Sequence, residues 1–166
     1  MTEHLYSHVL VPTDFRAECR AAYRVAFAAA LGSGATVSLL HVVAAESEDE
    51  YQGLDAIRLL HRAAEHVSSG KPLPPANPAA ARALQLERLR AEIHPEWIGP
   101  IELRLEVRTG DVVAEIARYA NESAVDLIVM GGARPGLFRG FGRSSADRLA
   151  RATPVKVVRV TPPALV

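Results

Sequence analysis

Short apolar runs alternate with amphipathic segments along this chain. Residues 8–12 (HVLVP) and 36–43 (TVSLLHVV) are almost continuously apolar, and residues 126–130 and 155–160 are short segments rich in apolar residues, whereas residues 101–107 alternate apolar and charged positions. Continuous apolar character is typical of strands buried on both faces of a parallel sheet. Strict alternation predicts a strand with one face in water, so we expect residues 101–107 to lie near a sheet edge.

The segments between these runs carry apolar residues at helical spacing. In the first of them the predicted buried stripe is Ala22, Val25, Ala26 and Ala29, and glycines at 32 and 34 end the helix. The predicted helices span about residues 17–31, 54–67, 78–93, 111–122 and 144–153. A proline-rich stretch, residues 72–78, separates the second and third helices and is interpreted as an exposed loop.

Strands that alternate with helices predict an α/β fold with a parallel sheet. Right-handed crossovers make a doubly wound five-stranded sheet the expected arrangement, with the strand order 3-2-1-4-5. We therefore expect one domain over residues 1–166, with a helical and proline-rich insertion at about 44–100.

The stretch from Asp126 to Thr153 has the composition of an anion-binding site. It joins a strand to a helix through a loop with glycines at 131, 132, 136, 140 and 142 and arginines at 134, 139 and 143. Glycines let backbone N–H groups approach a ligand, and a helix start offers unpaired donors. The alternative is a glycine-rich connection with solvated arginines, because the loop fits neither a dinucleotide nor a P-loop motif.

Topology selects the same loop independently of its glycines. In a 3-2-1-4-5 sheet the winding direction reverses between the first and fourth strands, and ligands bind outside the carboxyl ends there. Those ends are Pro12-Thr13-Asp14 and Met130-Gly131. Two alternatives stay open, since Asp14 could instead cap the first helix, and Ser144 and Ser145 could cap the last one without any ligand.

Composition and charge exclude several classes of protein. Hydrophobic residues make up 49% of the sequence but aromatics only 5%, so small aliphatic residues must fill the core. The 19 basic and 19 acidic residues balance, which argues against general binding of nucleic acid or of membranes. The one cysteine, Cys19, cannot form an internal disulfide, and with no signal sequence the chain is expected in the cytoplasm. No cluster has metal-ligand spacing, and no catalytic motif is present.

Several segments together resemble the universal stress protein family. They are HVLVPTDF, ATVSLLHVV, VRTGDVVAEIARYANESAVDLIVMG and SSADRLARATPVKVVRV, in this order and spacing. The resemblance implies the adenine nucleotide alpha hydrolase-like fold, a role in stress responses and signalling, and ATP as a ligand in many members. It also implies a homodimer, formed through the last strand, Val155–Val160.

The resemblance carries specific residues over to this chain. Asp14, beside Pro12, would contact the adenosine, and Val42 would border the base. The expected ligand-binding set is Pro12, Asp14, Val42, Met130, Gly131, Gly132, Arg134, Gly136, Arg143, Ser144 and Ser145.

Two departures from the family's phosphate loop matter. The second glycine of the pattern is missing around Arg134, and Arg143 stands where the third glycine is expected. The Arg143 side chain could fill the phosphate space, or it could bind phosphate by a different route. We therefore expect weak or absent ATP binding and no metal beyond Mg²⁺ accompanying a nucleotide.

Three functions follow from these observations. The first is a regulatory or sensor protein that binds an adenine nucleotide or another anion, and the second is a member without nucleotide that acts through its dimer or partner surface. The third, slow ATP hydrolysis, is the weakest, because only Asp14 lies near the loop as a base that could activate water.

Overall fold

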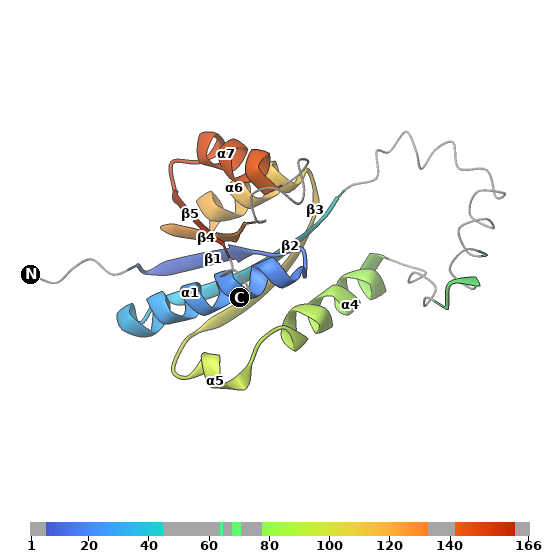
Figure 1. Ribbon diagram of the computed structural model, residues 1–166, viewed down its shortest axis with the longest axis horizontal. Coiled ribbons are helices and arrows are strands. Elements are labelled where there is room, and N and C mark those ends of the chain that lie inside the picture. Colours follow the sequence, from blue (N-terminus) through green and yellow to red (C-terminus); the bar gives the residue numbers. More distant parts are fainter. Residues whose placement is uncertain (1–5, 45–63, 65–67, 71–77, 133–141, 162–166) are drawn as a thin grey trace, which may run out of the picture.

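The computed structural model describes residues 6–44, 64, 68–70, 78–132 and 142–161. Five strands alternate with helices in this part of the chain (Figure 1). The strands are β1 (His8–Pro12), β2 (Thr36–Ala44), β3 (Leu103–Gly110), β4 (Leu127–Gly131) and β5 (Lys156–Val160). The helices are α1 (Ala17–Ser33), α4 (Pro78–Ala91), α5 (Pro95–Ile98), α6 (Val112–Glu122) and α7 (Gly142–Ala152).

The five strands form one parallel sheet in the order β3-β2-β1-β4-β5, which confirms the prediction. β1 lies at the centre and all five of its residues are buried. β2 pairs with it from His8 opposite Thr36 to Pro12 opposite Leu40. The reversal of winding between β1 and β4 is therefore where the sequence placed it.

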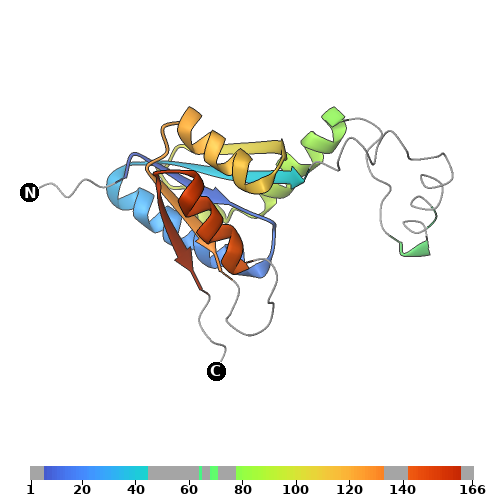
Figure 2. The ribbon, with the colours of Figure 1, turned by 90° about the horizontal axis from the view of Figure 1, so that it is seen from above.

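Helices cover both faces of the sheet. α1 and α4 lie on one face, and α6 and α7 lie together on the other (Figures 1 and 2). Each face has its own buried cluster, one built with α1 residues and the other with α6 and α7 residues. Such two-sided burial explains why β1 and β2 are almost continuously apolar.

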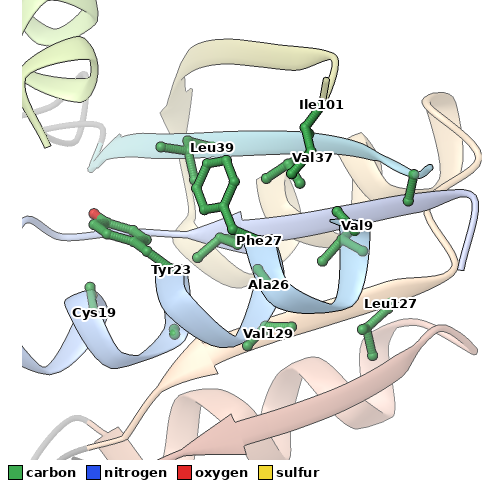
Figure 3. Packing of buried hydrophobic residues seen from close by; sticks show 14 of the residues in the cluster. Val9, Cys19, Tyr23, Ala26, Phe27, Val37, Leu39, Ile101, Leu127 and Val129 are labelled. Atoms are coloured by element: carbon green, nitrogen blue, oxygen red, sulfur yellow. The ribbon is translucent and has the colours of Figure 1, made fainter. Parts of the chain in front are cut away.

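The buried stripe of α1 was predicted only in part. Ala22 and Ala26 are fully buried, but Val25 is 40% exposed, so its placement in the stripe was wrong. The larger side chains of Tyr23 and Phe27 take the inner face instead and pack on the strands (Figure 3). Because an aromatic ring buries far more area than an alanine, these two residues set the rotation of the helix.

Boundaries elsewhere shifted by a few residues. β3 begins at Leu103 and reaches Gly110, three residues beyond the predicted end, because it pairs with β2 as far as Ala44. As expected, it is an edge strand. α4 (Pro78–Ala91) follows the predicted third helix, and its Leu89 is fully buried against the α1 face of the sheet. The helix predicted over about 54–67 lies outside the described residues, apart from residue 64.

A buried polar chain ties the amino end of the sheet together. The His8 ring donates from Nδ1 to the carbonyl of Ser123 at 2.8 Å, since a carbonyl can only accept. Its Nε2 lies 2.7 Å from the Ser38 hydroxyl, which lies 2.9 Å from the Tyr119 hydroxyl. The Asp126 carboxylate accepts the backbone N–H of His8 at 3.1 Å. These bonds connect β1, β2, α6 and the start of β4.

Candidate functional site

The carboxyl end of β1 presents one buried and one exposed polar residue. Thr13 continues the β1 backbone, where its N–H donates to the Leu40 carbonyl at 2.9 Å. Its hydroxyl is buried 2.5 Å from the Tyr23 hydroxyl, and burial raises the pKa of Tyr23. Thr13 is thus a fixed support, and the next residue, Asp14, is the first that a ligand can reach.

Asp14 lies in the turn that leads into α1. Its Oδ1 accepts the Arg16 N–H at 3.1 Å and the Cys19 thiol at 3.2 Å, and its Oδ2 lies 3.2 Å from Arg16 Nε. The helix begins with Arg16 at the N-cap position, so Asp14 does not cap α1 as the alternative supposed. Because 56% of the Asp14 side chain is exposed, the carboxylate is available to a ligand.

Phe15 has an unusual backbone conformation. Its φ is 65°, a left-handed value that is rare for a bulky residue. Its N–H donates to the Thr13 hydroxyl at 3.1 Å, and its ring lies 4.4 Å from the His41 ring, centroid to centroid. The guanidinium carbon of Arg88, on α4, lies 4.1 Å from the Phe15 centroid. These contacts hold the turn in its strained form.

His41 joins β2 to this turn. Its Nδ1 donates to the Thr13 carbonyl at 2.8 Å. Burial lowers the pKa of His41 from its ordinary 6.5, the Thr13 bond opposes this change, and the nearby Arg88 charge lowers the pKa further. Burial therefore favours the neutral form of the imidazole in the folded protein.

Gly131 is required by packing alone. A Cβ on it would lie 2.6 Å from the Glu18 carbonyl oxygen and 2.9 Å from Cys19 Cα, both in the first turn of α1. The next residue, Gly132, has a looser environment, because a Cβ there would meet the flexible Arg159 side chain at 2.6 Å. Its N–H donates to the Val160 carbonyl at 2.8 Å, which extends the pairing of β4 with β5.

Cys19 lies beside Asp14, and its thiol donates to the Asp14 carboxylate at 3.2 Å. Its side chain is buried, and burial raises the pKa of the thiol to about 11. A thiol is a nucleophile only as the thiolate. The burial of Cys19 therefore argues against a role as a nucleophile at this site.

Most of the remaining expected site residues that the structure describes lie on the α6–α7 face of the sheet. Pro12 is buried at the end of β1, while Val42 and Met130 are half-buried and pack against the α6–α7 cluster. Arg143, Ser144 and Ser145 lie in the first turn of α7, which begins at Gly142, two residues earlier than predicted. The two serines are therefore inside the helix and do not cap it from outside. Arg134 and Gly136 lie outside the described residues, as do the side chains of Arg143 and Ser144.

Three residues at the carboxyl ends of the strands were not predicted as site residues from the sequence: Phe15, His41 and Arg88. The first two adjoin predicted positions, Asp14 and Val42, and that adjacency was the available signal. Arg88 carried no signal, because its place depends on how α4 packs. Within the described residues, no group of His, Cys, Asp or Glu side chains could hold a metal ion. None of the described helices is long and apolar enough to cross a membrane.

Comparisons with known proteins agree on one family. A sequence profile described as the universal stress protein family matches residues 5–161. A search of curated proteins found no significant match.

Solved structures with the same fold include a universal stress protein, UspA, from Lactobacillus plantarum. It is 20% identical, with a TM-score of 0.62, over 95% of this chain and 99% of the other. A universal stress protein from Arabidopsis thaliana, with AMP bound, is 18% identical, with a TM-score of 0.54, over 95% and 93%. A universal stress protein in complex with cAMP is 19% identical, with a TM-score of 0.53, over 94% and 97%.

Proposed function

The chain belongs to the universal stress protein family, and on this premise we propose that it is a regulatory or sensor protein that binds an adenine nucleotide. The proposed site lies at the carboxyl ends of β1 and β4. The observation that carries the proposal is the Asp14 carboxylate, which stands exposed at the reversal of winding, where ligands of such sheets bind. Relatives of the same fold with AMP or cAMP bound support an adenine nucleotide over other anions.

Each end of the nucleotide has residues to meet it. The Asp14 carboxylate would accept hydrogen bonds from the adenosine hydroxyls. Its bonds to Arg16 and Cys19 already fix its orientation before a ligand binds. The half-buried Val42 side chain would border the base. The first turn of α7, with Ser144 and Ser145, would meet the phosphate through helix N–H groups.

Selectivity among nucleotides follows from the phosphate loop. With Arg134 and Arg143 in place of glycines, the loop backbone has less freedom to wrap a triphosphate. We therefore propose that AMP or cAMP binds better than ATP, and that Mg²⁺ enters only with a nucleotide. Isothermal titration with Arg143→Gly decides between the two roles of this arginine, because the affinity for ATP rises if Arg143 obstructs and falls if it is a ligand.

The proposed binding is tested on the purified full chain. Native mass spectrometry shows whether a nucleotide accompanies it, and isothermal titration compares AMP, cAMP, ATP and adenosine. Replacing Asp14 with Asn removes one charge but keeps an acceptor, so adenosine and AMP affinity should both fall by roughly ten-fold. Glu96→Gln, an exposed carboxylate on α5, is the control and should bind as wild type. Failure to bind any of the four ligands would refute the proposal.

We also propose that the protein is a homodimer that pairs through β5. This strand lies at the sheet edge, and an apolar edge left open is a liability for aggregation. Val158→Asp should weaken the dimer in sedimentation experiments, whereas Val25→Asp, at an exposed position on α1, should not. Because Val158 also contacts the core, the unfolding midpoint of each variant must be measured alongside. A wild-type monomer at micromolar concentration would contradict the proposal.

A further inference from the structure

We propose that Arg88, on α4, gives the anionic phosphate of the ligand a second contact at this site, in addition to the one proposed for the first turn of α7. The inference rests on the proposed nucleotide function and adds to it a residue from the chain's least regular region. Arg88 lies outside the four sequence segments, HVLVPTDF to SSADRLARATPVKVVRV, that carry most of the expected ligand-binding residues. We assign this role to Arg88 only from how it packs at the carboxyl ends of the strands, called the carboxyl edge below, against Phe15.

The Arg88 side chain is exposed, but its guanidinium lies against an aromatic ring. It lies over the Phe15 ring, 4.1 Å from guanidinium carbon to centroid, and the Phe15 ring lies in turn 4.4 Å from the His41 ring. His41 is fixed to the Thr13 carbonyl at 2.8 Å. Stacking on an aromatic face restricts the guanidinium to a plane while its N–H groups, which lie in that plane, remain free to donate.

The strain at Phe15 points to the same role. A φ of 65° is a strained backbone conformation for a bulky residue. That conformation places the ring between His41 and Arg88. Strained backbone that persists beside a binding edge is typical of functional sites, where the surrounding contacts over-determine it.

Arg88 differs from its neighbours in its charge partners. Arg16 pairs with Asp14, Arg82 with Glu106 and Arg90 with Glu87. In the described part of the chain, the recorded hydrogen bond of Arg88 runs from its Nη1 to the neutral Gln85 Oε1 at 3.2 Å, and no carboxylate pairs with it. A guanidinium has five donors, so most of them are available for a two-point contact with a phosphate.

The charges of Arg88 and Asp14 at the carboxyl edge are consistent with a role for Arg88 in phosphate binding. Arg88 and Asp14 both act on His41, with opposite effects on its pKa, so both charges lie near the same imidazole. A nucleoside phosphate has hydroxyl donors at its ribose and negative charge at its phosphate. One carboxylate and one guanidinium at a single edge match those two parts.

The test separates the phosphate from the nucleoside. Isothermal titration measures AMP, adenosine and inorganic phosphate with wild type, Arg88→Gln, Arg88→Lys and the control Arg90→Gln, an exposed arginine on the same helix. We expect Arg88→Gln to weaken AMP by roughly ten-fold or more, and phosphate likewise, while adenosine affinity is unchanged. Arg88→Lys should recover only part of the loss, because an ammonium cannot stack or bind in two places.

The outcomes distinguish this inference from the function on which it rests. Equal losses for AMP and adenosine, or unchanged AMP affinity, in Arg88→Gln would overturn the role of Arg88 and leave nucleotide binding in place. If wild type binds no nucleotide but binds phosphate in an Arg88-dependent way, the anion site stands and the nucleotide proposal falls. If wild type binds neither AMP nor phosphate, both are overturned.

Discussion

Gly131→Ala should destabilise the protein without any involvement of a ligand. The added Cβ would lie 2.6 Å from the Glu18 carbonyl oxygen, 2.8 Å from the Glu18 carbonyl carbon and 2.9 Å from Cys19 Cα. All three are backbone atoms of the first α1 turn, so no side-chain rotation can relieve the contact. Either α1 must move away from β4 or the end of β4 must bend.

The cost follows from what α1 covers. The helix carries Tyr23 and Phe27 into the largest buried cluster, and moving it would loosen those contacts (Figure 3). Overpacking of a core costs about 1–3 kcal/mol, and a backbone clash belongs at the upper end, so we expect a loss of about 2–3 kcal/mol. For a chain of 166 residues that lowers the melting temperature by roughly 4–12 °C.

Urea unfolding followed by circular dichroism gives the change in unfolding free energy. Gly32→Ala, near the end of the same helix, is the matched control, because nothing lies within 4 Å of its added Cβ. Helix propensity predicts that this control gains up to about 1 kcal/mol. If the unfolding free energy of Gly131→Ala lies within about 0.5 kcal/mol of wild type while the control behaves as stated, the close packing of α1 on β4 is not rigid and the prediction is wrong.

Three further predictions concern single residues. Ala124→Gly should stabilise the protein by about 0.5–1 kcal/mol in urea unfolding. Ala124 has a φ of 50°, and removing a Cβ from this left-handed conformation gains more free energy than the unfolded chain gains in entropy from the glycine. A loss of stability would contradict this prediction. Cys19, with its pKa raised to about 11, should react with a thiol reagent at pH 8 far more slowly than in the urea-unfolded chain, and equal rates would show that it is accessible. Because burial lowers the pKa of His41, the unfolded chain binds more protons, so stability should fall as the pH drops below 6.5; His41→Gln should flatten that slope, and an unchanged slope would mean that other groups cause it.

The sequence predicted the sheet because its strands are short and apolar and its crossovers are helical. The alternation around Leu103 and Leu105 also identified the edge strand. The rotation of α1 about its axis could not be predicted from the sequence, because a stripe of alanines is compatible with several rotations. The packing of the Tyr23 and Phe27 rings selects one of them.

At the site, Asp14 and Gly131 were both predicted from the sequence, but the sequence does not distinguish their roles. Gly131 was predicted as a phosphate-loop glycine, and the structure adds a packing reason for it that holds without any ligand. The stack on Phe15 was unpredictable, because it depends on an unusual φ and on a helix separated from it by more than sixty residues, as the positions of Phe15 and Arg88 show. Local pattern carries no information on such a contact.

The His8 chain at the amino end of the sheet has a consequence for motion. Its hydrogen bonds connect β1, β2, α6 and the start of β4 at the end of the sheet opposite the proposed site. Opening that end would leave buried polar groups without partners, so its amides should exchange with solvent only when the whole fold opens. The carboxyl edge, held by stacked side chains, can adjust by side-chain rotation while the frame stays fixed. A bound ligand should therefore slow exchange at the turn from Thr13 to Arg16 and leave the central strand as it was.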